Sequence, residues 1–356
     1  MEYKKYKLKE LLTIKNGKDH KQLPEGDYPV YGSGGYMRSV NSFLYDRTSI
    51  LLPRKGTLSN IQYVSGKPFW TVDTIYYTVL NEILYDPYYL FLYLNALDLS
   101  GYDSGASIPS MTSKTYYSLN IELPQKKIQV KVANIIRAYD NLIENNNKQI
   151  KLLEQMAENL YKEWFVRFRF PGYEGVEFEN GLPKDWEYTK LERLANISTG
   201  KCNREDAEED GAYPLFDRSQ EIKRSNVWLK DCEAIIVPGE GTSFIPRYYN
   251  GKFNLHQRCY CVEPLEKGMG FFLYQTLMMY RIYFLYVATG ATVPSLRLNN
   301  FNNFKVLLPK KELCFQYNEI AEKMNDEILL LKNKNELLAR QRDMLLPRLI
   351  SGKLEV

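Results

Sequence analysis

One segment of this chain occurs twice: Gly105-Ala106-Ser107-Ile108-Pro109-Ser110 returns, 185 residues later, as Gly290-Ala291-Thr292-Val293-Pro294-Ser295. The same offset relates further pairs without a gap: Tyr28-Pro29 to Tyr213-Pro214, Leu52-Pro53-Arg54-Lys55-Gly56-Thr57 to Val237-Pro238-Gly239-Glu240-Gly241-Thr242, Gly66-Lys67 to Gly251-Lys252, and Leu123-Pro124 to Leu308-Pro309. Near the start the offset is 183, a slip of two residues in a loop. A period this long exceeds that of a solenoid repeat and indicates a duplicated domain.

Composition is that of an ordinary globular protein. The 356 residues suffice for two to four domains, and they are 44% hydrophobic and 25% charged. The first residues are charged and resemble no secretory signal, and the apolar stretch 271–288 is interrupted by Gln275 and Arg281. We therefore expect a cytoplasmic protein with no membrane association. The net charge of +4 is only mildly basic and by itself argues weakly for a nucleic-acid partner.

The cysteines and histidines predict no metal centre. The five cysteines have no regular spacing, and only two histidines, His20 and His256, are present. Cys259 and Cys261 fall on one face of a predicted strand, but no second pair of ligands completes a zinc site. We expect reduced cysteines in strands and histidines on the surface or in loops.

Two long helices are predicted at equivalent places in the repeat. From Gln129 to about Phe165 the chain has no proline or glycine, and apolar residues recur at three- and four-residue steps. From about Glu312 to Leu346 they recur every seven residues, which is typical of a coiled-coil seam. The two aligned sets are Val132, Tyr139, Asn146, Leu153 and Leu160, and Tyr317, Met324, Leu331, Leu338 and Leu345.

Helices of this length, roughly 50 Å each, exceed what a compact domain needs. We expect them to pair as an antiparallel coiled coil that holds two globular domains apart, with Asn146 as a polar seam position that fixes the register. Two separate helical hairpins are the alternative.

The globular repeats have the pattern of a mixed α/β or α+β fold. Short β-rich runs, 61–64 and 70–78, are separated by glycine turns at Gly56 and Gly66. A helix is predicted to begin at Pro87, and its counterpart covers about 271–286. The chain order is therefore globular, long helix, globular, long helix, with an internal pseudo-two-fold repeat.

The helix ends and their flanks resemble the specificity subunits of type I restriction-modification enzymes. The most specific segments are Ala157-Glu158-Asn159-Leu160-Tyr161-Lys162-Glu163-Trp164-Phe165-Val166-Arg167-Phe168 and Leu345-Leu346-Pro347-Arg348-Leu349-Ile350-Ser351-Gly352, supported by Gly181-Leu182-Pro183-Lys184-Asp185-Trp186 and by the run from Leu123-Pro124 to Gln129 and Ala133. The resemblance covers nearly the whole chain.

The resemblance implies a division of the chain into two target recognition domains, 1–124 and 171–309, and two conserved spacer helices, 125–170 and 310–356. Each recognition domain would read one half of a split double-stranded DNA site. The helices would act as a spacer and dock the modification (methyltransferase) subunits, two of them expected, and the restriction (endonuclease and translocase) subunits would join the complex.

Base reading needs donors and acceptors that reach a groove, and phosphate contact needs cations, hydroxyls and backbone N–H groups. Glycine-rich loops with flanking basic residues supply both. The predicted DNA-binding residues are Lys18, Ser33, Arg54, Lys55, Thr57, Ser59 and Lys114 in the first repeat, and Lys201, Arg204, Arg218, Arg224, Thr242, Ser243 and Arg258 in the second. The two repeats share glycine at 56 and 241 but exchange Arg54-Lys55 for Gly239-Glu240, as expected of two readers of different base sequences. For any one of these residues, a plain solvated loop position is the competing interpretation.

Apolar residues outside the seam at the helix ends are candidates for partner docking. We predict docking patches formed by Trp164, Phe165, Leu346 and Leu349.

No catalytic motif is found in the sequence. The amino-methyltransferase signature is absent, Gly32-Ser33-Gly34-Gly35 lacks the Lys-Ser/Thr of a phosphate loop, and Gly239-Glu240-Gly241 lacks the third glycine of a dinucleotide fingerprint. Methylation and cleavage would then belong to partner chains. The modification subunits would bring S-adenosylmethionine, and this chain is expected to bind no cofactor and no metal.

The sequence therefore predicts a non-catalytic, sequence-specific DNA-binding subunit that recruits modification and restriction subunits. The rival hypothesis is a coiled-coil scaffold with two protein-binding α/β heads, for which no salt-dependent DNA affinity is expected. A self-contained enzyme is disfavoured by the missing motifs.

Overall fold

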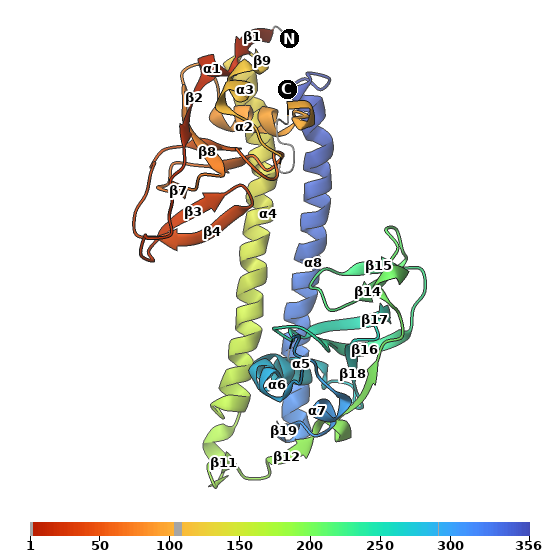
Figure 1. The fold of residues 1–356 in the computed structure, drawn as a ribbon. Helices are drawn as coiled ribbons and strands as arrows, with labels where there is room; N and C mark the ends of the chain where they lie inside the picture. Colours follow the sequence, from red (N-terminus) through yellow and green to blue (C-terminus); the bar gives the residue numbers. More distant parts are fainter. Residues whose placement is uncertain (1–2, 103–108, 291) are drawn as a thin grey trace. The chain divides into compact units, whose positions relative to one another are not determined.

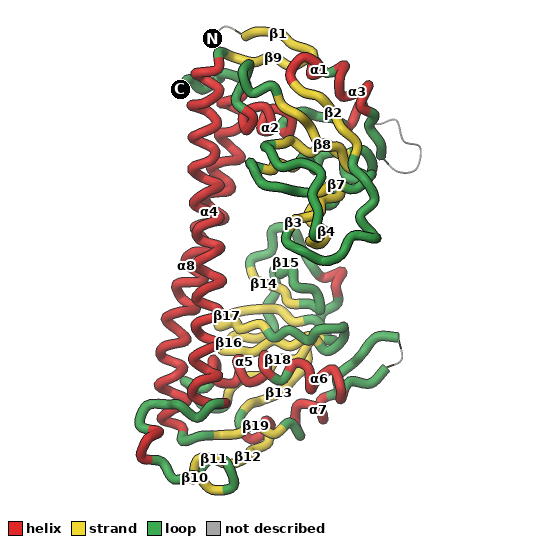
Figure 2. Tube along the Cα trace, turned by 90° about the vertical axis from the view of Figure 1, so that its left-hand side faces the viewer, coloured by secondary structure: helices red, strands yellow, loops and turns green. Residues whose placement is uncertain are grey.

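The structure, a computed structural model, describes residues 3–102, 109–290 and 292–356 (Figure 1). Residues 105–108 and Ala291 of the recurring segment lie outside the described residues. The chain forms two compact units: unit 1 is Met1–Asn146 together with Asn333–Val356, and unit 2 is Asn147–Lys332. Each unit contains strands, short helices and a part of both long helices (Figure 2).

Unit 1 holds three small antiparallel or mixed sheets. Their strand orders are β1-β9, β2-β8-β5-β6 and β4-β3-β7. The strands are β1 (Tyr3–Lys7), β2 (Leu12–Asn16), β3 (Tyr28–Gly32), β4 (Gly35–Val40), β5 (Ser49–Pro53), β6 (Gln62–Val64), β7 (Trp70–Thr71), β8 (Ile75–Leu80) and β9 (Asn120–Pro124). The short helices are α1 (Leu8–Leu11), α2 (Pro87–Asn95), η1 (Ser100–Tyr102) and α3 (Ser113–Ser118).

Unit 2 is built around a six-stranded sheet of order β13-β18-β16-β17-β14-β15. It also contains the two-stranded sheets β10-β11 and β12-β19. The strands are β10 (Phe178–Glu179), β11 (Leu182–Pro183), β12 (Glu187–Lys190), β13 (Ala195–Thr199), β14 (Tyr213–Phe216), β15 (Lys223–Ser225), β16 (Lys230–Pro238), β17 (Arg247–Leu255), β18 (Cys259–Pro264) and β19 (Lys305–Leu308). The short helices are η3 (Tyr173–Gly175), η4 (Leu191–Arg193), η5 (Arg204–Asp206), α5 (Gly270–Met279), α6 (Arg281–Val287) and α7 (Leu298–Asn302).

The sequence repeat is a repeat of topology. The order β2-β8-β5-β6 with β7-β3-β4 in unit 1 matches β13-β18-β16-β17-β14-β15 in unit 2, if β17 stands for β6 and β7 together. In unit 1 the turn around Gly66 interrupts this strand, whereas in unit 2 the chain passes Gly251, at φ +126°, without leaving the sheet. The single strand β17 of unit 2 therefore corresponds to the two strands β6 and β7 of unit 1.

The repeat extends to individual backbone hydrogen bonds. The Gly56 amide donates to the Pro109 carbonyl at 2.9 Å, and the Gly241 amide donates to the Pro294 carbonyl at 3.1 Å. A second backbone hydrogen bond joins the same two segments in each unit. The Met111 amide donates to the Arg54 carbonyl at 3.0 Å, and the Leu296 amide donates to the Gly239 carbonyl at 2.8 Å. We call these two equivalent structures the tip frames.

The two long helices are α4 (Lys126–Tyr161), continued by the π-helical turn η2 (Lys162–Val166), and α8 (Lys311–Ile350). They pack against each other in both units and run antiparallel, so two separate helical hairpins are excluded. In unit 1 the contacts are Asn146 Nδ2 to Asn335 Oδ1 at 2.8 Å and Arg342 Nη1 to Asp140 Oδ1 at 2.6 Å. In unit 2 they include the cluster of Ile150, Leu153, Ile328 and Leu331, and the Tyr317 hydroxyl, which donates to the Ala157 carbonyl at 3.1 Å.

Asn146 is buried in the seam, as predicted, and its partner Asn335 satisfies its amide. A buried amide pair is matched in one register only, because any shift leaves both amides against apolar neighbours. All ten residues of the two aligned heptad sets are buried or half-buried. The seven-residue pattern therefore identified the buried face of each helix.

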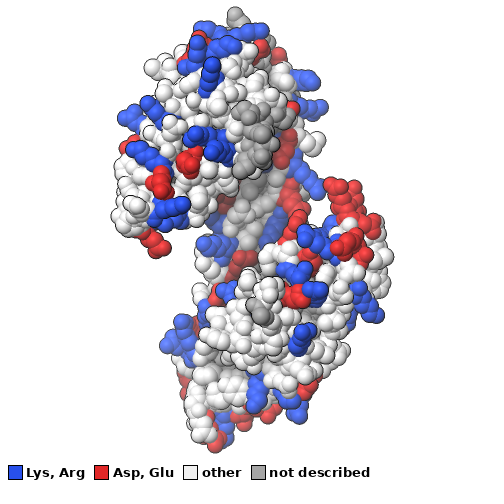
Figure 3. Space-filling view, viewed as in Figure 1, with Lys and Arg blue, Asp and Glu red and all other residues white. Residues whose placement is uncertain are grey.

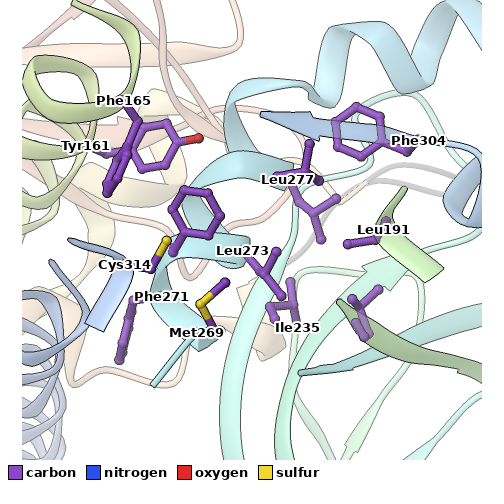
Figure 4. Packing of buried hydrophobic residues seen from close by; sticks show 14 of the residues in the cluster. Tyr161, Phe165, Leu191, Ile235, Met269, Phe271, Leu273, Leu277, Phe304 and Cys314 are labelled. Atoms are coloured by element: carbon purple, nitrogen blue, oxygen red, sulfur yellow. The ribbon is translucent and has the colours of Figure 1, made fainter. Parts of the chain in front are cut away.

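Each unit has its own apolar core, and the ends of the long helices are part of it. In unit 2, Trp164 and Phe165 belong to a core that includes residues of α5, β16 and the start of α8. Figure 4 shows Phe165 in this core. In unit 1, Leu349 is buried and Leu346 half-buried in the core beneath α2 and α3. The prediction that these four residues form exposed docking patches is therefore wrong. Apolar residues at the helix ends that do not face the other long helix are covered by the adjoining globular domain.

Caps and turns in the sequence predicted several of the element boundaries. Asp86 caps α2, accepting from the Tyr89 amide at 2.9 Å, with Pro87 in the first turn. The run 70–78 is split into β7 and β8 by the turn that the Ile75 amide closes on the Val72 carbonyl. The helix expected over about 271–286 is likewise divided, into α5 and α6 at Tyr280. Among the described residues, no helix is long and apolar enough to cross a membrane.

Candidate nucleic-acid interface

In unit 1 the tip frame presents the loop that follows β5. Gly56 has φ +91°, a conformation that favours glycine, and its amide is fixed on Pro109. The Arg54 amide donates to the Thr74 carbonyl at 2.8 Å, and the Arg54 guanidinium lies 5.9 Å from the centre of the Tyr76 ring. Arg54 is therefore half-buried and held in place, whereas Lys55 next to it is exposed.

A pocket of about 730 Å³ lies beside this loop in unit 1, with Ser33, Tyr36, Asp73 and Thr74 among its lining residues. The Ser33 amide is within 3.4 Å of Thr74 Oγ1, and the Ser33 carbonyl accepts from Asn60 Nδ2 at 2.7 Å. Asn60 and Thr74 were not predicted as site residues. They join loops that are far apart in sequence, and no local motif marks them.

The remaining predicted residues of unit 1 are exposed. Lys18 follows β2, with its amide on the Thr71 carbonyl at 2.8 Å, and Lys114 lies in α3. Thr57 and Ser59 lie in the tip loop itself. The structure thus gathers Ser33, Arg54, Lys55, Thr57 and Ser59 around one loop and pocket.

In unit 2 the equivalent tip carries a carboxylate between two arginines. Arg218 Nη1 lies 2.6 Å from Glu240 Oε2, and Arg258 Nη1 lies 3.0 and 2.8 Å from Oε1 and Oε2. The hydrogen bond from Arg258, helped by Arg218, lowers the pKa of Glu240, so the carboxyl group is ionised at neutral pH. We call these three residues the Arg-Glu-Arg cluster.

The backbone on both sides of Glu240 favours glycine, for a different reason at each position. A Cβ on Gly239 would lie 2.7 Å from the Arg258 carbonyl oxygen, and Gly241 has φ +131°. The Gly239 amide donates to that same carbonyl at 2.8 Å. Glu240 is therefore flanked by two glycines that the close approach and the turn require.

The pocket beside the cluster, of about 300 Å³, is lined by Arg204, Asp217, Arg218, Ser219, Glu240, Gly241, His256 and Val293. Burial raises the pKa of Asp217, but hydrogen bonds from Lys223 and Ser219 outweigh it and hold that pKa at about 2. Burial and the nearby Arg218 lower the pKa of His256. His256 lies in the short connection between β17 and β18, as expected of a loop histidine, but it is buried and its Nδ1 accepts from the Arg258 amide at 3.0 Å.

The other predicted residues of unit 2 divide into two groups. Lys201, Arg204, Thr242 and Ser243 are exposed near the tip or the pocket. Arg224 is exposed too, but its guanidinium donates to the carbonyls of Gly211 at 2.8 Å and Ala212 at 3.1 Å. Arg224 therefore ties β15 to the loop that precedes β14, and a structural role accounts for it.

Positive charge on the face of the molecule shown in Figure 3 is interspersed with negative charge, and no continuous basic surface covers the described residues on that face. The cations of the unit 2 tip follow the same pattern, since two arginines share one carboxylate there. Local geometry, more than net charge, distinguishes the tips.

A cluster that the sequence did not predict lies on the sheet of unit 2. Ligand atoms of Cys232, Cys261 and Glu263 lie within 4.8 Å of one another. The Lys230 ammonium is 3.2 Å from Glu263 Oε2, so a cation of the chain already neutralises this carboxylate. The five cysteines are all free thiols, four of them buried.

Comparison with known proteins identifies the family. The model for the type I restriction modification DNA specificity domain matches residues 1–155 and 183–340, and the chain belongs to this family. Its two matched segments correspond to the two copies of the repeat.

The relatives are specificity subunits of type I restriction enzymes. The subunit of MjaIX from Methanocaldococcus jannaschii is 26% identical over 310 residues, which is 78% of this chain and 70% of that protein. The subunit of EcoDI from Escherichia coli is 31% identical over 180 residues, 49% of this chain and 39% of that protein.

A crystal structure shares the fold. It is that of the S subunit of a type I restriction-modification system from M. genitalium, with a TM-score of 0.67 at 18% identity, covering 98% of this chain and 96% of that one. The predicted architecture, two globular domains alternating with two long helices, is thereby confirmed.

Proposed function

We propose that this chain is the non-catalytic subunit that sets the DNA sequence specificity of a type I restriction-modification complex. Each unit reads one half of a bipartite double-stranded target. The observation that carries the proposal is that two equivalent tip frames hold different side chains. Where unit 1 has Arg54 and Lys55, unit 2 has Gly239 and Glu240.

Chemistry supports this assignment of roles. The frame consists of backbone hydrogen bonds that both units share, although the residues at positions 54–55 and 239–240 differ. The tip side chains are donors and acceptors of the kinds that recognise base edges in the major groove. A shared frame with exchanged polar groups is what two readers of unrelated half-sites need.

Catalysis and the cofactor belong to partner chains in this proposal. Modification subunits supply S-adenosylmethionine and the methyl transfer, restriction subunits supply cleavage and translocation, and the complex works in the cytoplasm. The family membership and the absence of a catalytic motif from the sequence support this division.

Modular reading is the test. Replacing Arg54 and Lys55 with alanine is expected to impair discrimination at one half-site only, by about 1–3 kcal/mol for each base-reading side chain removed. Replacing Thr242 and Ser243 is expected to do so at the other half-site. The measurement is a binding titration against duplexes altered in one half-site at a time, at several salt concentrations and with the modification subunit present.

Two outcomes would count against the proposal or its details. If either double variant weakened both half-sites equally, these residues would bind phosphates, which positions the DNA but does not read it. If the wild-type complex showed no salt-dependent DNA affinity, the scaffold hypothesis would replace the proposal.

Exposed apolar residues on the long helices are the proposed docking surfaces for the modification subunits. In unit 1, Leu337 and Met344 are 58% and 71% exposed and lie seven residues apart on one face of α8. In unit 2, Leu152 and Met156 of α4 and Leu329 and Leu330 of α8 are likewise exposed. Large apolar side chains left in water next to a satisfied seam favour a protein partner. Exposed apolar residues thus occur on the long helices of both units, which agrees with the two modification subunits expected.

Replacing Leu337 and Met344 with glutamate is expected to reduce recovery of the modification subunit in a pull-down by at least tenfold, because charge is placed where apolar surface must be buried. The matched control replaces Lys334 and Arg340, exposed on the same helix, with glutamate. Equal recovery with both double variants would place the docking surface elsewhere.

A further inference from the structure

We propose that the Arg-Glu-Arg cluster of unit 2 reads a G·C base pair. The Glu240 carboxylate accepts from the cytosine N4 amino group, and one of the two arginines donates to O6 and N7 of the paired guanine. The inference rests on the proposed function, and it names the chemical feature that the half-site read by unit 2 must contain.

The cluster is assembled on the fixed part of the unit. Arg218 follows the end of β14, Glu240 follows the end of β16, and Arg258 immediately precedes β18. A backbone hydrogen bond next to the tip frame joins two of these segments, since the Gly239 amide donates to the Arg258 carbonyl at 2.8 Å. Groups that select one base over another must be held in a defined geometry, and strands of one sheet, β14, β16 and β18, provide it.

The two arginines offset the electrostatic repulsion between the Glu240 carboxylate and the DNA phosphates. A lone carboxylate is repelled by the phosphates, but Glu240 with Arg218 and Arg258 has a net charge of +1. Both guanidinium groups use Nη1 for the carboxylate, and each guanidinium carries five N–H donors. Donors therefore remain for a base while the carboxylate keeps its orientation.

The cluster offers donors and an acceptor side by side, which is the complement of a G·C edge. In the major groove guanine presents two acceptors, O6 and N7, and cytosine presents one donor, its N4 amino group. Arginine on guanine and glutamate on cytosine are the pairings that this geometry favours. Exposed Arg204, on the rim of the same pocket, is placed to meet a phosphate.

Unit 1 does not carry this chemistry at the equivalent frame positions. It has Ser33 and Lys55 in place of Arg218 and Glu240. In place of Arg258 it has Asp73 by the offset of 185 residues, or Thr74 by the equivalent backbone hydrogen bond. Lys55, an ammonium with no acceptor, stands where unit 2 has the Glu240 carboxylate, and the Asp73 carboxylate of the unit 1 pocket does not stand at that position of the tip. The effect is therefore expected at the half-site read by unit 2 and not at the other.

The experiment uses the full chain with its modification subunit. Methylated sites in cells that express the complex define the target, and duplexes altered at one base pair at a time are then titrated. With the wild-type chain, exchanging one particular G·C pair for A·T is expected to weaken binding about 5-fold to 150-fold, and 7-deazaguanine at that pair is expected to weaken it in the same direction. With Glu240→Gln, which removes the charge that orients both arginines, discrimination at that pair should fall by at least about threefold while all other positions keep theirs.

The matched control is Glu263→Gln, which removes the carboxylate of another ion pair on the same sheet and should leave every discrimination unchanged. The inference is overturned if Glu240→Gln leaves all G·C discriminations intact, lowers affinity for all duplexes equally, or changes discrimination at an A·T pair. The 7-deazaguanine titration uses only the wild-type chain, so it still tests the proposal if the Glu240→Gln variant folds poorly. Specific binding with any of these outcomes leaves the proposed function standing, whereas absence of DNA binding refutes the proposed function itself.

Discussion

Replacing Trp164 with alanine is expected to lower the free energy of unfolding by about 3–5 kcal/mol, as is usual when a buried tryptophan is removed. Trp164 is only 8% exposed, and its ring centre lies 6.2 Å from that of Phe165 and 6.1 Å from that of Tyr317. The substitution would therefore open a cavity at the junction of α4, α8 and the core of unit 2. Urea-induced unfolding followed by circular dichroism measures the effect.

The matched control is Leu142→Ala, on the same helix but 51% exposed, for which a change within about 0.5 kcal/mol is expected. A Trp164→Ala chain that kept its full stability yet failed to bind the modification subunit would restore the docking role that the sequence predicts for this residue. A chain that became less stable would show why apolar residues at helix ends are poor evidence for a partner.

Inserting four residues into both long helices, next to Asn146 and next to Asn335, is expected to widen the gap between the two half-sites by one or two base pairs. Four helical residues add about 6 Å, and a base pair adds roughly 3.4 Å. The bases recognised should stay the same, because the tips are untouched. Sequencing of methylated sites in cells that carry the altered gene measures both properties.

Both insertions are needed because Asn146 and Asn335 face each other across the seam at 2.8 Å. An insertion in α4 alone would shift the register and leave both amides unmatched, so loss of activity is expected from that control. An unchanged gap with full methylation after the double insertion would refute the spacer role of the helices.

The architecture could be predicted from the sequence because its signals are periodic. A heptad pattern reports which face of a helix is buried, and a repeat at a constant offset reports equivalent positions without any knowledge of the three-dimensional structure. Asn146 was identified in this way, since its place in the heptad set and its polarity together imply a partner across the seam. Asn335 itself lies outside the heptad set of α8.

The site was predicted less well, because its groups come from segments distant in the chain. Glu240 meets Arg218 and Arg258, 22 and 18 residues away, and an acidic residue taken alone argues against DNA binding. The same limit explains why Leu349 and Trp164 were predicted as docking residues although both are buried in the cores. The seam pattern shows what one helix face packs against, but nothing in it shows that a globular domain covers the other side.

The division of the chain has a consequence at the level of the gene. Unit 2 is one uninterrupted stretch, Asn147–Lys332, while unit 1 is made of two, Met1–Asn146 and Asn333–Val356. A single continuous block of coding DNA therefore specifies every residue of one reader, and both of its borders fall within helix-coding sequence. With each unit reading one half-site, as proposed, exchange of that one block changes the half-site read by unit 2 and leaves the other half-site as it was, whereas replacing unit 1 requires exchange of two separate stretches.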